Sequence, residues 1–83
     1  MTRFHWTKET WGYALRDSKN CARATVVRGK PPHDPGFYAQ VIASGMPDSG
    51  PYKSRLDAGD WAAGMLVKLE LVPKGSALAP LTF

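Results

Sequence analysis

Two segments rich in proline and glycine divide this chain and limit every helix or strand to the stretches between them. Residues 29–36 contain three prolines and two glycines, and residues 44–51 contain two of each. Proline cannot donate to a strand ladder, and glycine weakens both helices and strands. We therefore expect exposed loops in both segments and short elements around them.

The length of the chain sets how much core those elements can share. At 83 residues there is room for one hydrophobic core. Such a small domain must bury most of its bulky side chains, so the aromatic residues are expected to be mostly structural. We predict a single domain over residues 1–83, ending in an irregular tail over residues 73–83.

Alternating hydrophobicity predicts the strands. Residues 11–16 alternate large apolar with small or polar side chains, and a polar turn over residues 17–20 leads to a stretch with a β-branched centre over residues 21–28. Together they predict a hairpin in which Ala22, Ala24 and Val26 face the core, while Arg23 and Thr25 face away. Residues 37–43 are apolar on both faces, which indicates a central strand, and residues 52–56 are expected to form a short edge strand.

A helix is expected to follow these strands. Asp57 is a typical N-cap, and Asp60 three residues later places negative charge at the positive end of a helix. The helix can continue towards Pro73, or it can end near Gly64 and leave a final strand over residues 66–72. The fold class is thus α+β, with a small antiparallel sheet of three or four strands packed against one helix that starts near Asp57.

The residues that catalysis or metal binding would require are sparse. Cys21 is the single cysteine, so neither an internal disulfide nor a thiolate metal cluster can form. A pairing of Cys21 with His33 has no local signature, and the aspartates lie in turns or at the helix start, where aspartate is favoured anyway. The glycines match no phosphate-binding fingerprint. We expect no enzyme activity, no cofactor, no metal and no small-molecule substrate.

The amino-terminal residues and the hydropathy pattern bear on location. No apolar stretch at the start is typical of a signal peptide, and no run approaches the ~20 apolar residues that span a bilayer. The unpaired cysteine fits a reducing compartment. These features favour the cytoplasm of a bacterial host cell and no membrane partner.

The positive charge lies mainly in the part of the chain that forms strands. The formal net charge is +4, and residues 1–55 hold nine basic and four acidic side chains. Arginine pairs with phosphates and tyrosine stacks on bases, although a solvated sheet face would also be polar. The candidate residues for binding a partner or nucleic acid are Arg16, Arg23, Arg28, Lys30, Tyr38, Tyr52, Lys53 and Arg55.

Two hypotheses of function follow. In format, as a small α+β domain with one sheet, one helix and no catalytic groups, the chain resembles anti-CRISPR proteins, small viral inhibitors carried by phages and mobile elements. That resemblance implies protein binding, with a host protein or nucleoprotein complex such as a CRISPR effector as the partner. Many such inhibitors are acidic and copy nucleic acid, whereas this chain is basic, which argues against DNA mimicry.

The alternative is a DNA- or RNA-binding module that uses its sheet. Three strands followed by a helix, with residues 36–42 and 50–55 before that helix, resemble the arm-binding domains of phage integrases and a sheet-and-helix DNA-binding domain of plants. This resemblance implies contact between the basic face of the sheet and nucleic acid. The proline-containing loop after Lys30 departs from that pattern.

Overall fold

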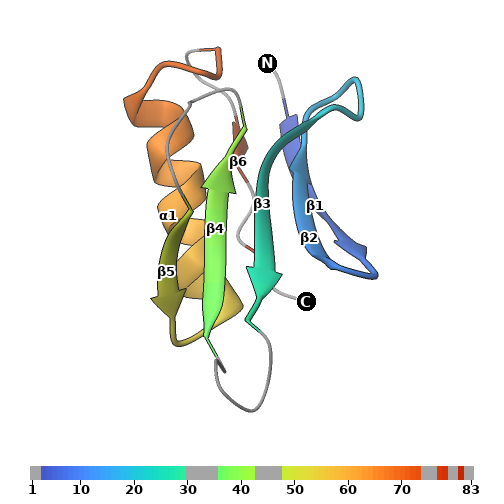
Figure 1. The fold of residues 1–83 in the computed structure, drawn as a ribbon. Helices are drawn as coiled ribbons and strands as arrows, with labels where there is room; N and C mark the ends of the chain where they lie inside the picture. The colour runs from blue at the N-terminus through green and yellow to red at the C-terminus, as the bar shows by residue number, and fades with distance from the viewer. Residues whose placement is uncertain (1–2, 30–35, 43–47, 74–76, 79–80, 82–83) are drawn as a thin grey trace.

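The computed structural model describes residues 3–29, 36–42, 48–73, 77–78 and 81. Figure 1 shows a twisted sheet with a single helix packed beside it. In chain order the elements are β1 (Arg3–Glu9), β2 (Gly12–Arg16), β3 (Ala22–Arg28), β4 (Phe37–Val41), β5 (Ser49–Tyr52), α1 (Arg55–Lys68) and β6 (Ala77–Leu78).

The strands are ordered β5-β4-β3-β2-β1-β6 across the sheet. Every neighbouring pair from β5 to β1 is antiparallel, and β6 adds to β1 in parallel. The α+β class, with an antiparallel sheet and one helix, is confirmed. The expected three or four strands were too few, because the sequence interpretation missed β1 and β6. In β1 the apolar alternation of Phe4 and Trp6 is interrupted at the next position by Lys8, so the strand pattern is short. β6 has two residues, which are too few to show a periodic pattern.

The predicted hairpin is present as β2 and β3. Leu15 pairs with Ala24 and Tyr13 with Val26, and the side chains of Leu15, Ala24 and Val26 are fully buried. Arg23 is exposed, as the alternation predicted. β4 lies between β3 and β5, so it is an internal strand. Local patterning was sufficient here because the pairing partners are neighbours in the chain.

The helix begins earlier than predicted. Ser54 is the N-cap, and its hydroxyl accepts a hydrogen bond from the backbone N–H of Asp57 at 3.2 Å. Asp57 therefore lies in the first turn of α1 rather than before it. The edge strand expected over residues 52–56 is wrong for the same reason, since β5 ends at Tyr52 and the helix begins at Arg55. Serine and aspartate are both good N-caps, and only the backbone path decides between them.

The helix continues through Gly64 and ends at Lys68, so the strand considered over residues 66–72 is wrong. The chain leaves α1 through Glu70, whose φ is 56°. The backbone N–H of Glu70 donates to the carbonyl of Val67 at 3.1 Å, and that of Leu71 donates to the carbonyl of Leu66 at 2.9 Å. This pair of bonds is a Schellman motif. The sequence did not reveal it because glutamate occupies the left-handed position where glycine is usual.

The core lies between the sheet and α1, which packs on β3, β4 and β5. In Figure 1 the helix runs beside β4 and β5, and the β1–β2 hairpin forms the other side of the sheet. Small side chains at Ala24, Ala39, Ala58 and Ala62 are fully buried, and they let the helix approach the sheet closely. The larger core side chains come from the two ends of the chain and from the strands and helix between: Phe4, Trp6, Leu15, Val26, Val41, Leu66 and Leu81.

The tail expected to be irregular contributes to this core. Ala77 and Leu78 form β6 beside Arg3 and Phe4 of β1, and Leu81 is 1% exposed. Burial of such a leucine stabilises the fold by about 2 kcal/mol. Among the described residues, no helix has the length and apolarity needed to cross a membrane.

Candidate functional site

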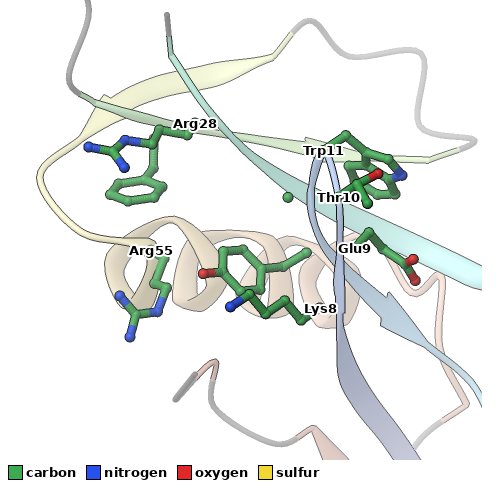
Figure 2. Close-up of a pocket in the computed structure, with 9 residues that line it drawn as sticks. Lys8, Glu9, Thr10, Trp11, Arg28 and Arg55 are labelled. Carbon is green, nitrogen blue, oxygen red and sulfur yellow. The ribbon is translucent and has the colours of Figure 1, made fainter. Parts of the chain in front are cut away.

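A cleft at one end of the sheet brings together residues from five elements, β1, β2, β3, β4 and α1, and from the turn between β1 and β2. Its volume is about 280 Å³. We call it the basic cleft. Figure 2 shows the residues that line it: Lys8, Glu9, Thr10, Trp11, Gly12, Tyr13, Arg28, Phe37 and Arg55.

The register of the sheet explains why these residues meet. Lys8 is paired with Tyr13 next to the β1–β2 turn, and Arg28 is paired with Phe37 where β3 ends and β4 begins. The first residue of α1, Arg55, lies at the same end. These residues are far apart in the chain, and antiparallel pairing together with the helix start places them around one opening.

Three cationic side chains enter the basic cleft without an anionic partner. Among the described residues, none of Lys8, Arg28 and Arg55 makes an ion pair. In Figure 2 Arg28 and Arg55 lie on one side, Trp11 lies on the other, and the ammonium end of Lys8 extends towards the arginines. The positive end of the α1 dipole adds to the same field.

Among the described residues, Glu9 supplies the one carboxylate that lines the basic cleft, and it does not neutralise these cations. Glu9 accepts a hydrogen bond from a guanidinium nitrogen of Arg16 at 3.1 Å and another from the hydroxyl of Thr7 at 3.0 Å. Its carboxylate points away from Arg28 and Arg55 in Figure 2. The Arg16 hydrogen bond, helped by that of Thr7, holds the pKa of Glu9 below its ordinary value of 4.5. Glu9 therefore stays ionised and hydrogen-bonded to Arg16.

Arg55, at the start of α1, has a hydrogen-bond donor without an acceptor among the described residues. Its Nε is buried and, among the described residues, has no hydrogen-bond partner. A buried donor without an acceptor costs about 1–3 kcal/mol. An anion that entered the basic cleft beside Arg55 could supply the missing acceptor.

Trp11 is the clear exception to the expectation that aromatic residues are structural. It lies in the β1–β2 turn and is 49% exposed, whereas Tyr13 and Phe37 are half-buried at the edge of the core. Gly12 next to it has φ of 152°, and a Cβ there would collide with the carbonyl of Val26. The turn can therefore form close to β3 only because residue 12 is glycine.

Of the residues proposed from the sequence that the structure describes, it brings together two, Arg28 and Arg55. Arg16 donates to Thr7, Glu9 and the carbonyl of Asn20. Arg23 donates to Asp17 at 3.1 Å, and it precedes Arg28 by five residues, or about 16 Å of strand. The side chains of Arg16 and Arg23 are therefore held by hydrogen bonds within the fold.

Tyr38, Tyr52 and Lys53 do not line the basic cleft. Tyr38 is half-buried on the face of β4 that points away from the helix. Tyr52 bonds to Ser49 at 2.6 Å between hydroxyl oxygens and lies 6.4 Å from the ring of Trp61. Lys53 is exposed between β5 and α1. Lys30 lies outside the described residues.

Sequence reasoning missed Lys8 and Trp11. Lys8 belongs to the strand that was not predicted, and Trp11 was placed in a strand rather than in a turn. The adjacent Gly12, which follows a two-residue turn, was the signal that could have placed Trp11 at a hairpin tip.

A second hollow of about 230 Å³ lies at the opposite end of the sheet, and its lining includes Asp17, Lys19 and Arg23. Both carboxylate oxygens of Asp17 accept hydrogen bonds there. This hollow therefore lacks the convergent unpaired charge of the basic cleft. In the part of the chain that the structure describes, no group of three histidine, cysteine, aspartate or glutamate side chains is placed to hold a metal ion.

No protein-family model, curated protein or solved structure matches this chain. The candidate site therefore rests on geometry and charge. Both point to the basic cleft rather than to the face of the sheet.

Proposed function

We propose that this chain is a small non-enzymatic binding protein that takes single-stranded nucleic acid in the basic cleft. The observation that carries the proposal is the convergence of three unpaired cations with an exposed tryptophan in one opening. Arginine forks fit phosphate oxygens, and an indole face accepts any base by stacking.

The shape of the basic cleft favours a single strand over a duplex. A paired base is stacked on its neighbours and cannot also lie on Trp11, whereas an unpaired base can. The exposed tryptophan and the cations Arg28 and Arg55 lie on opposite sides of the opening in Figure 2. One nucleotide can thus direct its base one way and its phosphate the other.

The first experiment measures binding of labelled single-stranded DNA and RNA by fluorescence anisotropy across a range of salt concentrations. The logarithm of the affinity should fall with log[salt], with a slope of about −0.7 for each phosphate that the cations of the basic cleft neutralise. The double variant R28Q/R55Q should weaken binding and flatten this slope. Absence of binding at about 50 mM salt would overturn the proposal.

A matched control removes the same charge elsewhere. Lys19 and Lys68 are exposed and lie outside the basic cleft. The variant K19Q/K68Q loses two positive charges, as R28Q/R55Q does, but should keep most of the affinity. Equal losses in the two double variants would indicate a diffuse effect of net charge and would count against the site.

Exposed apolar side chains on the helix favour a second candidate function, that of a phage or mobile-element inhibitor. Leu56 is 42% exposed and Val67 is 57% exposed, and their eleven-residue separation is close to three helical turns, so both lie on one stripe of α1. In this second proposal, these two side chains would contact a host protein or nucleoprotein complex such as a CRISPR effector.

A reconstituted cleavage assay tests this second candidate. The protein should inhibit target cleavage by a purified effector complex, and L56S/V67S should lose inhibition while retaining its unfolding midpoint. Lack of inhibition across several effector types would remove the support for this candidate.

A further inference from the structure

The charge in the basic cleft exceeds what one internal phosphate of a strand would neutralise. Lys8, Arg28 and Arg55 together offer three positive charges, and Glu9, the one acidic residue in the part of the lining that the structure describes, is bound to Arg16. An internal phosphodiester carries a single negative charge. A terminal phosphomonoester carries about −1.5 to −2 at neutral pH and three acceptor oxygens.

The size of the basic cleft also limits its occupant. About 280 Å³ is at or below the lower end of the range for small-ligand sites. Such a volume suits one nucleotide unit rather than several. A strand that ends in the cleft would place one nucleotide in it.

We propose that the basic cleft binds the phosphorylated end of a nucleic-acid strand, with the terminal phosphate between Arg28 and Arg55 and the terminal base against Trp11. This inference rests on the proposed function and specifies its ligand. The buried Nε of Arg55, which has no partner among the described residues, donates to an oxygen of that phosphate. Lys8 supplies the remaining positive charge from the β1 side.

The test compares three oligothymidylates of about six residues, which differ only in their ends: one with a 5′-phosphate, one with a 3′-phosphate and one with hydroxyls at both ends. One phosphorylated form should bind about tenfold more tightly than the hydroxyl form. Equal affinity for all three would overturn this inference but leave single-strand binding intact. No binding to any of them would overturn the proposed function as well.

Variants of Arg55 and Trp11 test the phosphate contact and the base contact separately. R55K keeps the charge but removes Nε and the planar fork, and it should abolish the preference for a phosphorylated end while retaining binding to the hydroxyl form. W11A should weaken binding to all three oligonucleotides by a similar factor. K19Q serves as the control and should change neither quantity. A preference that survives in R55K would contradict the role assigned to Arg55.

Competition distinguishes the end of a strand from free phosphate. Thymidine 5′-monophosphate should displace the labelled oligonucleotide at lower concentration than inorganic phosphate does, because only the nucleotide also contacts Trp11. Equal potency of the two competitors would mean that the base contributes nothing, and would overturn the proposed arrangement.

Discussion

Asp17 organises the turn between β2 and β3 through both carboxylate oxygens. One oxygen accepts hydrogen bonds from the backbone N–H groups of Lys19 and Cys21, at 2.9 and 3.0 Å, and the other accepts from Arg23. The side chain is buried, with Asn20 in the left-handed region completing the turn. These bonds, chiefly that of Cys21, hold the pKa of Asp17 below its ordinary value of 3.8.

This lowered pKa predicts how stability depends on pH. The folded protein binds a proton at Asp17 less readily than the unfolded chain does, so the stabilisation is present above pH 3.8 and is lost as the pH falls through the folded-state pKa. The variant D17N should be less stable than the wild type at neutral pH, and the gap should narrow in acid. Urea unfolding from neutral pH into strong acid checks this.

The control for this prediction is Asp60, which is exposed on α1. D60N removes the same charge from a side chain that accepts no hydrogen bond among the described residues, so it should change stability little at neutral pH. If the difference in stability between wild type and D17N stays constant in acid, the pH dependence does not arise from protonation of the Asp17 carboxylate.

At the scale of elements, α1 contains two glycines in opposite surroundings. A Cβ at Gly59 would lie 2.9 Å from the Cβ of Leu81 and 3.2 Å from Cζ2 of Trp6, whereas nothing lies within 4 Å of one at Gly64. Gly59 is therefore required by close packing of the helix on the core. Gly64 faces solvent and only weakens the helix.

The same substitution should consequently have opposite signs at the two positions. G59A should destabilise the protein by about 1–3 kcal/mol, because the core must shift to admit a methyl group. G64A should stabilise it by about 0.5–1 kcal/mol through helix propensity. Chemical unfolding followed by tryptophan fluorescence measures both, and each variant is the control for the other. A stabilising G59A would contradict the packing of α1 against Leu81.

At the scale of the whole molecule, the two ends of the chain close the core together. β6 pairs with β1, and Leu81 lies among core residues that include Trp6. The total stability of a domain of this size is about 5–15 kcal/mol, so burial of Leu81 contributes a large share of the free energy of unfolding. Ala77, Leu78 and Leu81 thus belong to the fold rather than to an irregular tail.

L81A should therefore destabilise the protein by about 2–5 kcal/mol, since it leaves a cavity under β1 and α1. L69A removes a leucine that is 40% exposed and should change stability by no more than about 0.5 kcal/mol. Thermal unfolding of both variants checks the difference. Similar effects of the two substitutions would show that Leu81 does not carry the core contact.

Local features of the sequence were enough to predict the β2–β3 hairpin, the presence of one helix and the burial of Ala24 and Val26. These follow from two-residue and helical periods, which act over neighbouring residues. The helix start and end were missed because Ser54 and Asp57 are both good caps and because Glu70 occupies a position that usually reveals itself as glycine.

The sequence by itself determined that this small chain is basic in its strand-forming part and poor in catalytic groups. Only the tertiary structure decided which basic residues are used. Arg16 and Arg23 are held by Glu9 and Asp17, whereas Arg28 and Arg55 meet Lys8 and Trp11 in the basic cleft. The physical reason is that a charge acquires its partners from strand order and register, which bring together side chains that no local pattern connects.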